Sequence, residues 1–184
     1  MVEVEIKLPI KNKEIVEKSL EKLGFVKAGL VREEDVYFDN ESNQIRKNGE
    51  ALRVRKVTNF VTNESETRIT FKGKKLDQIS MTRKELETGV SDAEVCIQIL
   101  EAIGYQAIPP EVVKTRQEYT FENVTACIDQ VQDLGDFLEL EILIEEDENK
   151  ENALQQIEII LRRLGYTLKD TTRTSYLSML QLDK

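Results

Sequence analysis

The chain has 184 residues, of which 40% are hydrophobic and 33% are charged, a composition typical of one globular domain that folds without disulfide bonds. No apolar run reaches the length of a membrane span and no secretory signal opens the chain, so we expect a cytoplasmic protein with no membrane partner. The net charge of -9 excludes a partner held by general attraction to a phosphate backbone, and we expect no nucleic acid.

Three segments have the periodicity of amphipathic helices. They cover about residues 13–23, a stretch that begins at Ser91, and roughly residues 150–164. Glu94 follows Ser91 by three residues, which predicts a capping box at the start of the second helix. Each segment ends in a glycine and an aromatic residue, which predicts a left-handed glycine cap. These ends are Gly24-Phe25, Gly104-Tyr105 and Gly165-Tyr166.

Most of the remaining chain alternates apolar and polar residues with period two, the pattern of β-strands. The clearest runs are residues 2–8, 51–57, 67–72, 82–88, 113–121, 125–131 and 137–144. Asn48-Gly49 is a turn signal, and Pro109-Pro110 is expected to mark the end of the second helical unit. The acidic run 145–148 is expected to be a solvated loop before the last helix. No linker or low-complexity tract interrupts the chain, so residues 1–184 are predicted to form a single domain.

Two residue types limit the chemistry. Histidine is absent, which removes the commonest general base and transition-metal ligand, so any metal must be held by carboxylates that suit Mg²⁺ or Mn²⁺. Cys96 and Cys127 lack metal-site or redox spacing and are expected to be reduced thiols.

Charges along the strands are sorted by sign. Glu3, Glu5 and Lys7 share one face of the first run, while later runs carry paired bases such as Arg53 and Arg55. For any one run, a solvated sheet face explains the pattern. Taken together, the sorting and the three helices that need an apolar surface favour a curved sheet with its helices outside. Its charged faces then point into a lumen, where they must pair or bind a ligand.

The predicted lumen has nearly balanced charge. Its bases are Lys7, Arg53, Arg55, Lys72, Lys114 and Arg116. Its acids are Glu3, Glu5, Glu85, Glu87, Asp129, Glu139 and Glu141. A metal-bound triphosphate satisfies both sets, because arginines bind phosphate oxygens and carboxylates bind hard cations. Two alternatives are a non-catalytic polyphosphate-binding module, which gains little from so many acids, and a barrel whose charges form only structural ion pairs.

Several motifs resemble one family. Glu3-Val4-Glu5-Ile6-Lys7 has the E-x-E-x-K form of the CYTH, or triphosphate tunnel metalloenzyme, superfamily. Further blocks follow in the family's order over nearly the whole chain. They are Tyr37-Phe38-Asp39, Leu52-Arg53-Val54-Arg55, Thr70-Phe71-Lys72-Gly73, Arg83-Lys84-Glu85-Leu86-Glu87, Lys114-Thr115-Arg116, Asp129, Leu134-Gly135-Asp136-Phe137-Leu138-Glu139-Leu140-Glu141 and Arg173-Thr174-Ser175-Tyr176-Leu177. Gly73 precedes Lys74 rather than the proline often found there, a departure in a loop.

The resemblance implies an α+β fold: an eight-stranded antiparallel closed β-barrel, or tunnel, with a charged lumen and helices packed on the outside. It implies triphosphate binding by Lys7, Arg53, Arg55, Lys72, Lys114, Arg116 and Arg173. It implies a divalent metal held by Glu3, Glu5, Glu139, Glu141 and Asp129. The residues implied to be catalytic are Glu3, Glu5, Lys7 and Asp129, and Glu85 and Glu87 are further lumen acids.

Within the superfamily, the compact length and the terminal Arg-x-Ser-Tyr block look most like class IV adenylyl cyclases. These convert ATP to cyclic AMP and pyrophosphate. The alternative is an inorganic or thiamine triphosphatase, which attacks a terminal phosphorus with water. The expected partner is a small-molecule triphosphate (ATP, tripolyphosphate or thiamine triphosphate), and the sequence leaves a homodimer open. The shared motifs bind the triphosphate common to these substrates, so they do not separate the two reactions.

Overall fold

The computed structural model describes residues 2–76, 79–145 and 150–182, and these residues form a barrel of eight strands with helices around it. The strands are β1 (Val2–Pro9), β2 (Val26–Asn40), β3 (Ala51–Asn59), β4 (Ser65–Lys72), β5 (Arg83–Val90), β6 (Tyr105–Phe121), β7 (Val124–Val131) and β8 (Gly135–Ile144). The helices are α1 (Lys13–Lys22), α2 (Gln44–Lys47), α3 (Ala93–Ala102), α4 (Lys150–Arg163), the 3₁₀-helix η1 (Leu168–Asp170) and α5 (Tyr176–Leu182).

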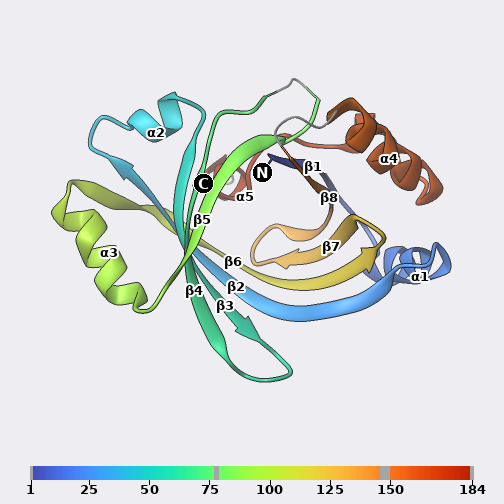
Figure 1. The fold of residues 1–184 in the computed structure, drawn as a ribbon, viewed down its shortest axis with the longest axis horizontal. Coiled ribbons are helices and arrows are strands. Elements are labelled where there is room, and N and C mark those ends of the chain that lie inside the picture. Colours follow the sequence, from blue (N-terminus) through green and yellow to red (C-terminus); the bar gives the residue numbers. More distant parts are fainter. Residues whose placement is uncertain (1, 77–78, 146–149, 183–184) are drawn as a thin grey trace.

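The strands close in the order β1-β5-β4-β3-β2-β6-β7-β8, with every neighbouring pair antiparallel. The first and last strands pair along their whole length, and this register places Glu5 opposite Glu141. The pairing of β1 with β5 covers only Val2 and Glu3, so the barrel closes there by a short ladder. Figure 1 shows the helices outside this barrel. The predicted α+β tunnel is confirmed.

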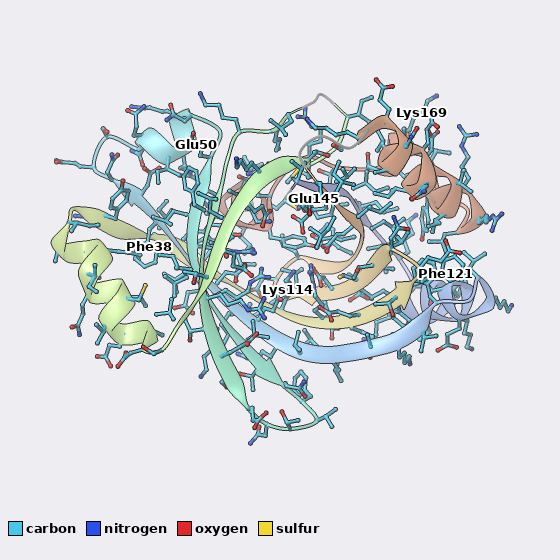
Figure 2. All side chains as sticks on the ribbon, in the orientation of Figure 1. Phe38, Glu50, Lys114, Phe121, Glu145 and Lys169 are labelled. Atoms are coloured by element: carbon cyan, nitrogen blue, oxygen red, sulfur yellow. The ribbon has the colours of Figure 1, made fainter. Side chains whose placement is uncertain are left out.

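Strand parity separates an apolar outside from a charged inside, as the alternation predicts. The alternate residues Val4, Ile6 and Leu8 of β1 are almost fully buried on the outer side, where α1 and α4 cover them. Outward residues of β7 and β8 join this cluster, while α3 covers a second one around Phe38 and Val54. Residues of the opposite parity face the lumen, as Lys114 does in Figure 2.

Glycine ends each predicted helix in the expected conformation. Gly24, Gly104 and Gly165 have φ values of +96°, +96° and +87°, so the predicted left-handed caps are confirmed. The predicted start of the second helix was wrong. Asp92, rather than Ser91, caps α3, because its carboxylate accepts a hydrogen bond from the backbone N–H of Val95 at 3.0 Å.

Two strand features differ from the sequence expectation. Strand β2 was not among the predicted runs, because four consecutive charged residues, 32–35, hide its alternation. Pro109-Pro110 lies inside β6 instead of ending a helical unit. The pairing of β2 with β6 shifts register there, between Asp35 and Tyr37, and such a bulge tolerates prolines because it does not need their missing N–H groups.

Smaller elements complete the description. Helices α2 and α5 were not predicted, since four and seven residues are too few to display a clear helical period. The acidic run 145–148 lies largely outside the described residues. Both cysteines are free thiols, as expected. No helix in the described parts of the chain has the length and apolar content needed to cross a lipid bilayer.

Ile157 and Ile159 of α4 provide a matched test of the buried face. Ile157 is fully buried, whereas Ile159 is 54% exposed. We expect Ile157→Ala to lower the free energy of unfolding by about 2–5 kcal/mol, because it leaves a cavity against the barrel wall. We expect Ile159→Ala to change it by less than about 0.5 kcal/mol. Urea unfolding measures both, and equal losses would contradict this packing.

Candidate active site

The barrel encloses a cavity of about 1020 Å³. All the lumen residues predicted from strand parity line it except Asp129, and Arg173 lines it as well. Its volume lies at the upper limit of the range for small-molecule sites, so it has room for a ligand the size of a nucleotide. Most of the predicted groups are buried, so ion pairs or a bound ligand must compensate their charges.

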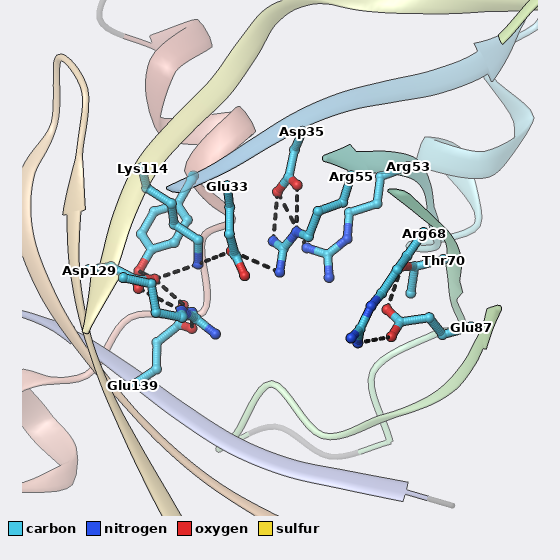
Figure 3. A network of polar contacts seen from close by, with 12 residues as sticks. Glu33, Asp35, Arg53, Arg55, Arg68, Thr70, Glu87, Lys114, Asp129 and Glu139 are labelled. Atoms are coloured by element: carbon cyan, nitrogen blue, oxygen red, sulfur yellow. Dashed lines mark hydrogen bonds and ion pairs between the residues drawn. The ribbon is translucent and has the colours of Figure 1, made fainter. Parts of the chain in front are cut away.

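The β2–β3 wall is organised by one carboxylate (Figure 3). Asp35 accepts hydrogen bonds from Nε and Nη2 of Arg55 at 2.6 and 2.7 Å, and Nη1 of Arg53 lies 3.4 Å from the same carboxylate. Glu33 lies 2.8 Å from Nη1 of Arg55 and 3.1 Å from Nζ of Lys114. Burial would raise the pKa of Asp35, but the charges of Arg55 and Arg53 outweigh it and lower that pKa. The two arginines are therefore fixed in place before any ligand binds.

A second carboxylate organises the β6–β7 wall. Asp129 is fully buried and accepts hydrogen bonds from Nζ of Lys114 at 2.5 Å and from Nε and Nη2 of Arg116, both at 2.7 Å. Arg116 also donates to Glu139 and lies 3.5 Å from Glu141. Tyr176 of α5 donates from its hydroxyl to Asp129 at 3.2 Å. The structure thus places Asp129 and Glu139 against two of the bases that were predicted to bind phosphate.

Three carboxylates gather on the β1–β8 wall, which adjoins β7 and lies across the barrel from β2 and β3. Glu3, Glu5 and Glu141 each offer one oxygen, and these oxygens lie within 4.8 Å of one another. Burial and neighbouring carboxylates raise the pKa of both Glu5 and Glu141. At Glu3 burial has the same effect, but the ammonium of Lys72 outweighs it and lowers that pKa to about 2. A cluster of oxygen donors that repel one another fits a hard divalent cation, which would neutralise them together.

The remaining predicted residues lie beside these groups. Lys72 is paired with Glu3 at 3.4 Å and with Glu85. Glu87 accepts hydrogen bonds from Thr70 at 2.8 Å and from Arg68 at 3.0 Å, so it belongs to a separate polar cluster on β4 and β5. Arg173 donates from Nε to the carbonyl of Ser80 at 3.0 Å.

Some lumen residues were missed by the sequence analysis. Glu33 and Asp35 share the inward parity of Tyr37, a signal that the unrecognised strand β2 concealed. Arg83 shares the parity of Glu85 and also lines the cavity, so the same rule could have found it. Lys75 lines the cavity from the segment after β4, where no strand period applies.

Comparison with known proteins gives one consistent family. The CYTH domain model matches residues 1–176. A Methanocaldococcus jannaschii protein, named a putative adenylate cyclase, is 38% identical over 180 residues, which is 97% of this chain and 98% of its own.

Solved structures agree with this match. The PH1819 protein of Pyrococcus horikoshii has a TM-score of 0.88 at 35% identity, with 99% of both chains covered. A Hippeastrum protein, described as a putative adenylyl cyclase with a dominant triphosphatase activity, shares the fold with a TM-score of 0.68 at 15% identity. That similarity covers 99% of this chain and 96% of that one.

Removing the Asp35 carboxylate tests the β2–β3 wall. We expect Asp35→Asn to lower the free energy of unfolding at neutral pH by about 3–5 kcal/mol, because Arg53 and Arg55 lose their buried counter-charge. The folded-state pKa of Asp35 is lowered, so its contribution is complete above the ordinary value of about 3.9 and is lost as pH falls through the lower folded value. The difference between wild type and variant should therefore shrink in acid.

Urea unfolding at pH 7 and in acid measures this difference. Glu34→Gln is the control, since Glu34 is the next residue on β2 and its pair with Arg32 is half-exposed. A difference between Asp35→Asn and wild type that stayed constant with pH would contradict the electrostatic explanation.

The carboxylate cluster predicts a divalent-cation site. We expect Glu141→Gln to weaken Mn²⁺ or Mg²⁺ binding by at least about tenfold, since it removes one of three clustered donors. The metal-free variant should melt no lower than wild type, because the change also removes repulsion from Glu3 and Glu5. Titration calorimetry and thermal melting measure both effects. Glu87→Gln is the control, and equal weakening in both variants would argue against a localised site.

Proposed function

The chain belongs to the CYTH domain family, and from this premise we propose that it is a cation-dependent enzyme that converts ATP to cyclic AMP and pyrophosphate. The descriptions of similar proteins include adenylate cyclase and triphosphatase, and both of these activities act on a triphosphate. One observation carries the proposal. One cavity inside the barrel holds a crowded carboxylate cluster together with bases already fixed by their own buried counter-ions.

The bases give the site its affinity for phosphate. Arg55 and Arg116 are buried and held by two hydrogen bonds each to Asp35 and Asp129, so binding costs little reorganisation. Among the described residues, Lys7 has no carboxylate within ion-pair distance, which leaves its ammonium available to an incoming anion. Arg53, Lys72, Lys114 and Arg173 complete the proposed triphosphate-binding set.

The acids are proposed to bind the cation and to assist proton movement. Glu3, Glu5 and Glu141 are the proposed ligands of Mg²⁺ or Mn²⁺, and Glu139 and Asp129, predicted from the family motif, stay predictions as further ligands. When bound, the cation supplies positive charge to phosphate oxygens and lowers the pKa of an attacking hydroxyl. Glu5 is the proposed proton acceptor, because burial and neighbouring carboxylates raise its pKa above that of an ordinary glutamate.

In the cyclase reaction the ribose 3′-oxygen forms a bond to the α-phosphorus, its proton passes to the proposed acceptor Glu5, and the bond from the α-phosphorus to the pyrophosphate oxygen breaks. The proposed role of Lys7, Arg55 and Arg116 is to neutralise the charge that develops on the leaving pyrophosphate. The alternative is an inorganic or thiamine triphosphatase, in which water attacks a terminal phosphorus in the same cavity. The two reactions differ in the nucleophile, a ribose hydroxyl or water, and in which phosphorus it meets. The single-domain organisation, the cytoplasmic location and a homodimer stay predictions.

A product assay tests the proposal. Purified protein with Mg²⁺ or Mn²⁺ is offered ATP and tripolyphosphate separately, and products are read by phosphorus NMR. We expect cyclic AMP and pyrophosphate from ATP. We also expect at least a hundredfold loss of rate in Glu139→Ala and Arg55→Ala, because each removes a buried charge from the site. Orthophosphate from tripolyphosphate, with ATP barely changed, would instead establish the triphosphatase.

A further inference from the structure

The C-terminal helix places one aromatic side chain among the charges of the site. Tyr176, the first residue of α5, is 7% exposed, and its ring packs edge-on against Phe137 with 5.0 Å between centroids. The centroid of its ring lies 4.3 Å from Nζ of Lys7 and 5.3 Å from Nζ of Lys114. Its hydroxyl donates to Asp129 at 3.2 Å. One side chain therefore touches two ammonium groups and the carboxylate that anchors the β6–β7 wall.

Lys7 depends on this ring more than the other bases do. It is 3% exposed, and burial lowers its pKa. The described residues place no carboxylate within 4.0 Å of its ammonium, whereas Lys72 and Lys114 each have such partners. Glu139 and Glu5 attract this ammonium only from beyond that distance, and the negative face of the aromatic ring adds a stabilising contact at close range. The ring therefore holds Lys7 at a defined place in the lumen while leaving its N–H groups unused by carboxylates.

The chain around Tyr176 reinforces this contact. The backbone N–H of Thr172 donates to the carbonyl of Lys7 at 2.7 Å, so the segment before α5 fixes the backbone of the same lysine. Gln181 of α5 donates to the carbonyl of Pro109 at 2.8 Å and accepts from Arg46. These bonds tie α5 to β6 and α2, and so fix the position of the ring.

We propose that Tyr176 is a positioning residue of the active site, whose ring holds Lys7 and Lys114 in place for a polyphosphate ligand. Helix α5 is then part of the binding apparatus as well as a cover for the barrel. This inference rests on the proposed function, since it assigns phosphate binding to the two lysines. The competing view is that Tyr176 only anchors the C-terminus, because it also belongs to an apolar cluster with Val112, Val131 and Leu177.

Three variants separate the two views. Tyr176→Phe keeps the ring and loses the hydroxyl, and Tyr176→Leu loses both. Leu177→Ala is the packing control, because Leu177 is the next residue of α5 and is 6% exposed in the same apolar cluster. Tripolyphosphate binding in the presence of Mg²⁺ is measured by titration calorimetry, and the melting temperature of each variant is recorded.

We expect Tyr176→Phe to bind within about threefold of wild type and Tyr176→Leu to bind about tenfold more weakly, since only the second loses the ring contact with both lysines. Leu177→Ala should bind like wild type even if it melts lower. If Tyr176→Leu does not fold, Tyr176→Met replaces it with the same expectation, because methionine fills irregular space without a ring. In a Lys7→Met background, the loss of the ring should weaken binding by a smaller factor.

Two outcomes would overturn the inference alone. One is wild-type affinity in a folded variant without the ring, and the other is an equal loss of affinity in Leu177→Ala. Failure of the wild-type protein itself to bind tripolyphosphate would overturn the proposed function, and this inference with it.

Discussion

The balance of charge inside a closed barrel is the constraint on which the rest of this structure depends. Carboxylates, guanidinium groups and ammonium groups share an enclosed space where an unpaired charge is costly. Strand alternation then forces the apolar residues to the outside, where they cannot face water over so large an area. Helices α1, α3 and α4 follow as the covering layer, so the charged lumen and the surrounding helices have one physical cause.

The acids in the lumen are of two kinds: some are paired with bases, and others are crowded by neighbouring carboxylates. Asp35 and Asp129 each form ion pairs with two bases, and these ion pairs hold the bases in fixed positions. Glu5 and Glu141 are crowded against other carboxylates, which makes their ionised forms unfavourable until a positive charge arrives. In the proposed function, the first kind holds bases ready for an anion, and the second favours a cation. A ligand carrying both charges, such as a metal-bound triphosphate, fits between them.

Strand parity made most of the fold and lumen predictable, because one face of every strand had to be apolar. The prediction failed where that signal was masked or absent. The charged run 32–35 hid β2, and with it Glu33 and Asp35, although both follow the same parity. Asp92 displaced Ser91 as a helix cap because two equally good cap residues adjoin, and only geometry decides between them. The contacts of Tyr176 with Lys7 and Lys114 were not predicted, since no local pattern reveals that a C-terminal helix reaches β1 and β6.

The pairing of β1 with β8 has a consequence for how the protein is made. The carboxylate cluster takes Glu3 and Glu5 from the first strand and Glu141 from the last, so its members are among the most distant residues in the chain. Contacts of such sequence separation form late, after the loop-closure entropy of the intervening chain has been overcome. During synthesis the first strand must therefore wait, with its acids exposed, until the eighth has emerged from the ribosome. The carboxylate cluster and the closed barrel therefore become complete in the same step, and a chain that lacks β8 holds neither.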